Sequence, residues 1–250
     1  MSRADKISLK IKRQEHPETS PYWEEFSIPW EPNMNVISML MAIQLNPTNA
    51  SEEKTTPVAW DCSCLEEVCG ACTMIINGQV RQACSALVDN LNQPITLEPL
   101  TKFPIIGDLV VDRSIIFANL KKVKAWIDID GTYDIGPGPR IAPEVQEWAY
   151  QLSRCMSCGC CMEACPNVNR KSSFFGPAVL TQVRLFNAHP NGAMKKKDRL
   201  QAIMGKGGIS ECGNAQNCAR ACPKELPLVQ TIGQLNRDTT IHGIIRWFSK

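Results

Sequence analysis

A dense run of cysteines at residues 155–166 constrains this chain more than any other feature. Cys155, Cys158, Cys161 and Cys165 are spaced C-x2-C-x2-C-x3-C and are followed by proline, a pattern typical of cysteines that bind iron–sulfur clusters. Three thiolates separated by two residues can surround one cubane, whereas the fourth leaves that loop and points at a different cluster. The run therefore predicts that a second set of cysteines lies elsewhere in the chain.

The second set lies at residues 212–223, but it is incomplete, because Ala215 stands where the second cysteine of the pattern would be. If the two runs exchange their fourth cysteines, one cluster receives four thiolates and the other receives three. The four-cysteine set is Cys155, Cys158, Cys161 and Cys222, and the three-cysteine set is Cys165, Cys212 and Cys218. Four thiolates indicate a [4Fe–4S] cluster and three indicate a [3Fe–4S] cluster, with a water or hydroxide as fourth ligand the open alternative.

A third set of cysteines lies nearer the N-terminus and has a different spacing. Cys64, Cys69 and Cys72 are spaced C-x4-C-x2-C, which is the plant-type pattern for a [2Fe–2S] cluster. An Asn-Gly pair at residues 77–78 predicts a tight hairpin, because both positions of a type I′ turn need positive φ. This hairpin would return the chain to the cysteine loop and deliver Cys84 as the fourth ligand.

Four other residues near these ligands have smaller expected roles. Gly70 and Ala71 lie between two of the ligands, and their small size would let backbone amides approach the cluster sulfurs and tune the reduction potential. No cluster needs Cys62 or Cys160. We interpret Cys160 as a packing residue and Cys62 as an ordinary thiol, although Cys62 is close enough to a ligand to substitute for it.

The first part of the chain has the pattern of a small sheet domain. Residues 5–13 alternate apolar and polar side chains, as a half-buried strand does, and residues 36–45 have helical spacing after a capping Asn35. The other expected elements are a strand at residues 22–28, the hairpin after the cysteine loop and a last strand at residues 95–99. This order predicts a β-grasp domain of the plant-type ferredoxin kind over residues 1–105.

The rest of the chain, residues 106–250, is expected to form an all-α domain of the bacterial-ferredoxin kind, so the fold class is α+β. Apolar residues recur at helical spacing on both sides of the two cysteine runs. Helices are expected at residues 112–126, 144–154, 177–188, 196–204, 226–236 and 239–248, with a loop at residues 127–143. An Asn-Gly pair at residues 191–192 indicates a turn between two of the helices.

The cysteine content and the charge exclude several classes of protein. Thirteen cysteines without a secretory signal indicate metal binding in a reducing compartment rather than a disulfide framework. The formal net charge of +2 implies no strong attraction to nucleic acid, and no stretch approaches the roughly 18 apolar residues of a membrane span. Phosphate-loop and dinucleotide-binding glycine patterns are absent, so no nucleotide or flavin site is expected on this chain.

Together these features resemble the iron–sulfur subunit of succinate dehydrogenase and quinol:fumarate reductase, over essentially the whole chain. The resemblance rests on the three cysteine sets, on residues 77–78 and 176–177, and on Arg184 followed by Phe186. It implies that a separate flavoprotein subunit with covalent FAD oxidises succinate, while this chain passes electrons singly through the [2Fe–2S], [4Fe–4S] and [3Fe–4S] clusters to quinone. It also implies a chain without catalytic residues, held on the cytoplasmic face of the membrane by an anchor subunit.

The details resemble the menaquinone-linked branch of this family, whose cytochrome b anchor carries two b haems. In ubiquinone-linked relatives a Trp follows the Cys-Pro of the first run, and a His follows the first cysteine of the second run. Here Pro166 is followed by Asn167, and Cys212 is followed by Gly213. Pro166, Asn167 and Gly213 are therefore the candidate residues that face the anchor and the quinone, and menaquinone is the expected quinone.

Two other interpretations are open at this point. A soluble fumarate reductase with a non-quinone donor would use the same clusters, although such proteins usually carry more cysteines beyond Cys222, and residues 231–250 contain none. The cysteines could instead bind structural zinc in an interaction module without redox activity, because four thiolates also suit that ion. The exchange of fourth cysteines and the missing second cysteine have no rationale in a zinc site.

Overall fold

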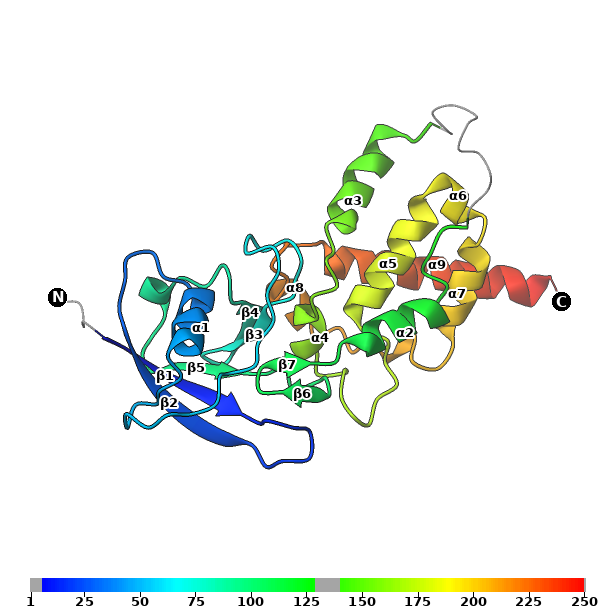
Figure 1. Cartoon of the computed structure of the whole chain (residues 1–250). Helices are drawn as coiled ribbons and strands as arrows, with labels where there is room; N and C mark the ends of the chain where they lie inside the picture. The colour runs from blue at the N-terminus through cyan, green and yellow to red at the C-terminus, as the bar shows by residue number, and fades with distance from the viewer. Residues whose placement is uncertain (1–5, 129–139, 250) are drawn as a thin grey trace. The chain divides into compact units, whose positions relative to one another are not determined.

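The computed structural model describes residues 6–128 and 140–249 (Figure 1). The chain divides into two compact units, Met1–Arg113 and Ser114–Lys250, so the division lies eight residues beyond the expected boundary at residue 105. The loop expected at residues 127–143 falls largely outside the described residues. Within the described ranges, no helix combines the length and the apolar character that crossing a membrane requires.

The first unit is built on a mixed five-stranded sheet with the strand order β2-β1-β5-β3-β4. Its strands are β1 (Lys6–Arg13), β2 (Tyr22–Pro29), β3 (Thr73–Ile76), β4 (Gln79–Gln82) and β5 (Ile95–Glu98). β1 pairs with β5 in parallel, and the other neighbouring strands are antiparallel. This is the β-grasp arrangement that the sequence predicts.

The helix α1 (Val36–Leu45) covers one face of this sheet (Figure 1). Its first turn is capped by Asn35, whose side-chain oxygen accepts a hydrogen bond from the backbone N–H of Ser38 at 2.9 Å. Apolar side chains of α1 and of the sheet share one core, in which Ile7 and Leu40 are completely buried. The predicted helix and its cap are therefore confirmed.

The predicted hairpin joins β3 to β4. Asn77 and Gly78 have φ angles of 49° and 75°, so both lie in the left-handed region that a type I′ turn requires. The side chain of Asn77 also accepts a hydrogen bond from the backbone N–H of Thr96 at 2.7 Å, which ties the turn to β5. A second sheet of two strands, β6 (Ile105–Gly107) and β7 (Val110–Val111), was not expected, because such short strands show no periodic pattern.

The second unit is helical in its described part, as the sequence predicts. Its α-helices are α2 (Ser114–Lys122), α3 (Pro143–Ser153), α4 (Cys160–Glu163), α5 (Pro177–Ala188), α6 (Pro190–Ala193), α7 (Lys196–Met204), α8 (Asn217–Arg220) and α9 (Leu228–Phe248). It also contains the short 3-10 helix η2 (Ile209–Glu211), whereas the 3-10 helix η1 (Val88–Asn90) lies in the first unit. α5 packs against α2, α3, α7 and α9 and so forms the centre of this unit (Figure 1). The helix expected at residues 112–126 is confined to α2, and the turn expected at residues 191–192 is the short helix α6, capped by His189.

One prediction for the C-terminal region is wrong. The separate helices expected at residues 226–236 and 239–248 form one continuous helix, α9. The hydroxyl groups of Thr239 and Thr240 donate to backbone carbonyl oxygens one turn earlier, at 2.9 and 2.8 Å. These polar side chains thus make their hydrogen bonds within the helix, and α9 continues through them.

Candidate metal centres

The first cysteine set lies on a loop and at the base of a hairpin in the N-terminal unit. Cys64 and Cys69 belong to the irregular segment before β3, Cys72 directly precedes β3, and Cys84 lies just after β4. The backbone N–H of Ala83 donates to the carbonyl oxygen of Cys72 at 3.1 Å, so the hairpin brings Cys84 back beside Cys72. Cys72 and Cys84 are buried, whereas Cys69 is exposed.

Backbone N–H groups of the loop point at the sulfur atoms. Those of Val68 and Cys69 donate to Cys64 Sγ at 3.2 and 3.3 Å, and that of Ala71 donates to Cys69 Sγ at 3.4 Å. Three loop residues have positive φ and turn the backbone sharply: Leu65, Glu67 and Gly70. Such N–H···S bonds stabilise negative charge on sulfur, as a cluster ligand requires.

The electrostatics of this loop separate its thiols into two kinds. Backbone N–H groups of Glu66 and Val68 lower the pKa of Cys64 to about 7, so this thiol ionises easily. Burial, together with the neighbouring Cys72 and Cys64, raises the pKa of Cys84 to about 11. Because Cys72 and Cys64 both act on the pKa of Cys84, these three predicted [2Fe–2S] ligands lie near one another. The thiolate form is the one that binds metal, so iron would displace these protons.

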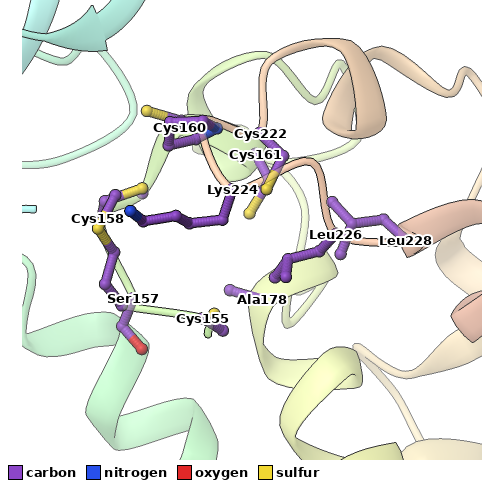
Figure 2. Close-up of a pocket in the computed structure, with 13 residues that line it drawn as sticks. Cys155, Ser157, Cys158, Cys160, Cys161, Ala178, Cys222, Lys224, Leu226 and Leu228 are labelled. Carbon is purple, nitrogen blue, oxygen red and sulfur yellow. The ribbon is translucent and has the colours of Figure 1, made fainter. Parts of the chain in front are cut away.

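The second set lines one pocket in the helical unit, although its members come from distant parts of the chain (Figure 2). Cys155 and Cys158 lie between α3 and α4, Cys161 lies in α4, and Cys222 follows α8. Burial raises the pKa of Cys161, and the nearby Cys158, Cys155 and Cys222 raise it further. The structure thus brings together the four cysteines that an exchange of fourth ligands predicts, and their binding of a cluster stays a prediction.

The wall of this second pocket is suited to a charged cluster. Ala178, Leu226 and Leu228 supply buried apolar surface, which would exclude water from a bound group. The side chain of Lys224 extends across the pocket toward Cys158 (Figure 2). A positive charge at this place would offset part of the negative charge of four thiolates.

The third set lines a separate pocket of the same unit. Cys165, Cys212 and Cys218 meet there, and Ala215 belongs to the same wall. Burial raises the pKa of Cys218, and the nearby Cys165 and Cys212 raise it further. Three thiolates and a methyl group around one pocket fit the incomplete ligand set that the sequence predicts.

The residues expected to face the anchor, Pro166, Asn167 and Gly213, also line this third pocket. Asn167 Nδ2 donates to the carbonyl oxygen of Glu211 at 2.8 Å, which holds the amide beside Gly213. A Cβ atom on Gly213 would lie only 3.0 Å from Asn167 Oδ1. Because Gly213 has no side chain, the amide group of Asn167 can lie directly against its backbone.

The two cysteines without an expected ligand role lie in different surroundings. Cys62 is exposed, whereas Cys160 is completely buried and lines the second pocket together with the four expected ligands. Within the described residues, no three or more His, Cys, Asp or Glu side chains are arranged to hold one metal ion. The two cysteine sets of the helical unit line pockets, and a cluster of several irons bridged by sulfide needs such room, whereas one zinc ion does not.

One contact of the N-terminal loop has no signal in the sequence. The guanidinium group of Arg113 donates to the carbonyl oxygens of Gly70 at 2.5 Å and Ala71 at 3.1 Å, between Cys69 and Cys72. These partners lie 43 and 42 positions apart in the chain, so neither cysteine spacing nor periodicity could pair them. Lys224 carries only a weak signal, its position directly after the Cys-Pro of the second run.

Comparisons with known proteins agree with this arrangement. Residues 8–118 match the family described as a 2Fe-2S iron-sulfur cluster binding domain, and residues 151–226 match a 4Fe-4S dicluster domain. Over 248 residues the chain is 59% identical to the succinate dehydrogenase iron-sulfur subunit of Bacillus subtilis. The matched region covers 99% of this chain and 98% of that subunit. The chain belongs to the family of succinate dehydrogenase and fumarate reductase iron–sulfur subunits.

Two further comparisons have lower sequence identity. The fumarate reductase iron-sulfur subunit of Wolinella succinogenes is 32% identical over 222 residues, and the matched region covers 88% of this chain and 90% of that subunit. A chain of the Mycobacterium smegmatis Sdh1 complex in the apo form has the same fold, with a TM-score of 0.79, 20% identity, and 94% and 95% coverage. Family membership confirms the predicted α+β class and the role of this iron–sulfur subunit in electron transfer, and it contradicts the zinc-module interpretation.

Proposed function

We propose that this iron–sulfur subunit carries electrons singly along three clusters, from a flavoprotein subunit with covalent FAD to a membrane anchor and a quinone. Residues 1–105 would form the [2Fe–2S] domain and residues 106–250 the domain of the other two clusters. The ligands would be Cys64, Cys69, Cys72 and Cys84 for [2Fe–2S], Cys155, Cys158, Cys161 and Cys222 for [4Fe–4S], and Cys165, Cys212 and Cys218 for [3Fe–4S]. The observation that carries this proposal is the sorting of the seven expected ligands of the two runs: four line one pocket, which Cys160 also lines, and three line the other.

The bound clusters would supply one-electron chemistry, and the chain controls where and at what potential it occurs. The loop amides that point at Cys64 and Cys69 stabilise charge on sulfur in the first centre. Leu226 and Leu228 keep the second pocket apolar, so nearby charges act there with little screening. Dicarboxylate chemistry is then left to the flavoprotein subunit.

The finer assignments concern the end of the electron path. Pro166, Asn167 and Gly213 around the third pocket lack the Trp and His of ubiquinone-linked relatives, which supports menaquinone and a cytochrome b anchor with two b haems. The chain would then lie on the cytoplasmic face of the membrane, held by that anchor. The named relatives include both succinate dehydrogenase and fumarate reductase subunits, so the ligand set suits either direction of electron flow.

Low-temperature electron paramagnetic resonance (EPR) of the purified complex tests the cluster assignment. The air-oxidised sample should show a [3Fe–4S] signal, and reduction should replace it with a [2Fe–2S] signal. Chemical analysis should find about ten inorganic sulfides per chain. Zinc in these positions, or an EPR-silent oxidised sample, would contradict the proposal. Haem b and menaquinone in the same preparation test the anchor and the quinone.

A further inference from the structure

The guanidinium group of Arg113 contacts the backbone of the [2Fe–2S] loop. Nη1 and Nη2 each donate to a different carbonyl oxygen, those of Gly70 and Ala71, which are the two residues between Cys69 and Cys72. A planar guanidinium presents such donors in a fixed geometry, so it can hold two successive peptide groups at once. Arg113 follows β7 and belongs to the same compact unit as the loop.

The peptide group between Gly70 and Ala71 connects Arg113 to a ligand sulfur. Its carbonyl and its N–H point in opposite directions, because a trans peptide group is planar. On one edge Arg113 donates to the Gly70 oxygen at 2.5 Å, and on the other the Ala71 N–H donates to Cys69 Sγ at 3.4 Å. Thr73 Oγ1 donates to the same carbonyl at 2.7 Å, which further restrains this peptide group.

We propose that Arg113 is a positioning residue that raises the reduction potential of the [2Fe–2S] centre. This proposal rests on the ligand set proposed above. When one electron from the flavoprotein enters the centre, the negative charge of the cluster increases. No bond breaks and no proton moves at Arg113, because a guanidinium stays protonated. N–H···S bonds and a nearby cation favour this more negative, reduced form. Hydrogen bonding to the Gly70 carbonyl also polarises the peptide group and strengthens its N–H as a donor to Cys69.

Potentiometric EPR titration of the purified complex tests this role, because a merely structural residue would leave the potential unchanged. Arg113→Gln should shift the [2Fe–2S] equilibrium about tenfold toward the oxidised form, which corresponds to 59 mV for one electron. Arg113→Lys keeps the charge but loses the planar pair of donors, so its potential should lie between those of Arg113→Gln and the unaltered complex. The other two centres in the same sample should keep their potentials.

The matched control removes one positive charge from the same unit at a residue that does not contact the loop. Lys10 on β1 pairs with Glu25 on β2 at 2.7 Å at the exposed surface, and Lys10→Gln should leave the potential unchanged. An unaltered potential in Arg113→Gln, or an equal shift in Lys10→Gln, overturns the proposal. If Arg113→Gln assembles no [2Fe–2S] centre, Arg113→Lys decides, and an unaltered potential there overturns it. A complex that lacks the [2Fe–2S] signal before any substitution would instead overturn the proposed function.

Discussion

Arg13 and Asp108 form an ion pair inside the N-terminal unit, with Arg13 Nε 3.0 Å from Asp108 Oδ1 and neither side chain more than 3% exposed. The same carboxylate accepts hydrogen bonds from the backbone N–H groups of Gln14 at 2.9 Å and Ala59 at 2.8 Å. Arg13 ends β1, and Ala59 lies five residues before Cys64. The pair therefore joins the segment that leads into the cysteine loop to the central sheet.

We expect Asp108→Asn to lower the free energy of unfolding by about 3 kcal/mol, because it leaves the buried guanidinium of Arg13 without this charged partner. Glu24 also pairs with Arg13, at 2.5 Å, which keeps the loss at the lower end of the usual range for a broken buried pair. Asn tolerates the positive φ of 42° at this position, so the substitution adds little backbone strain. Thermal denaturation of the purified complex, followed by circular dichroism and cluster absorbance, measures the loss.

An exposed carboxylate provides the control for Asp108→Asn. Asp89 accepts a hydrogen bond from Trp30 Nε1 at 3.0 Å near the surface of the same unit. Asp89→Asn should cost no more than about 1 kcal/mol, because water replaces a lost partner there. Equal losses for the two substitutions would show that burial of the Arg13 pair is not what matters.

Replacing Ala215 by cysteine should convert the third centre to [4Fe–4S], because it supplies the missing thiolate in the wall of that pocket. The oxidised complex should then lose its [3Fe–4S] EPR signal, and reduction should produce a second [4Fe–4S] signal. Ala219→Cys in α8 adds the same thiol outside the lining of this pocket and should leave the [3Fe–4S] signal in place. An unchanged signal in Ala215→Cys would mean that the ligand set is incomplete or that residue 215 cannot reach the iron.

Features that depend on neighbours along the chain could be predicted from the sequence. The hairpin at residues 77–78 depends on two backbone conformations that Asn and Gly adopt readily, and both angles are found. The cap of α1 depends on a side chain three residues from its partner, Asn35 to Ser38. The exchange of Cys165 and Cys222 between two pockets follows from a spacing rule, although the runs are far apart in the sequence.

Contacts made by tertiary packing could not be predicted in this way. Arg113 contacts Gly70 across 43 positions of the chain. It follows β6 and β7, which are too short to show a period. α9 continues through Thr239, which is buried and bonds to a carbonyl of its own helix, and the helix packs against α5 and α7. Composition alone favours a break there, and packing overrides that preference.

The contact between Gly213 and Asn167 predicts a non-additive pair of substitutions. Gly213→Ala should cost about 1 kcal/mol, because the new Cβ would lie 3.0 Å from Asn167 Oδ1 and push the amide from Glu211. Asn167→Ala alone should cost a similar amount through the lost hydrogen bond. In the double variant the new Cβ meets no amide, so the total loss should fall below the combined single losses. Denaturant titration of the four proteins measures this coupling, and strictly additive losses would contradict the contact.

The loop amides around Cys64 predict an unusual pH dependence of thiol reactivity once iron is removed. The pKa of Cys64 is lowered from 9.0 to about 7, whereas burial raises that of Cys84 to about 11. Since the thiolate is the reactive form, alkylation of Cys64 should be half-maximal near pH 7 and that of Cys84 only near pH 11. Iodoacetamide labelling of the folded, metal-free protein, read by mass spectrometry, measures both profiles in one sample.

The same shift determines how Cys64 affects the stability of the metal-free protein. A folded pKa below the unfolded value means that the fold stabilises the thiolate, so this contribution is complete above about pH 9 and is lost as the pH falls through about 7. Cys64→Ser removes an easily ionised group and should flatten the pH dependence of unfolding between these limits. Denaturation in urea should bring the labelling profiles of Cys64 and Cys84 together, because the loop amides and the burial are then gone. If the two profiles already coincide in the folded protein, the N–H groups of Glu66 and Val68 do not stabilise the thiolate as their geometry indicates.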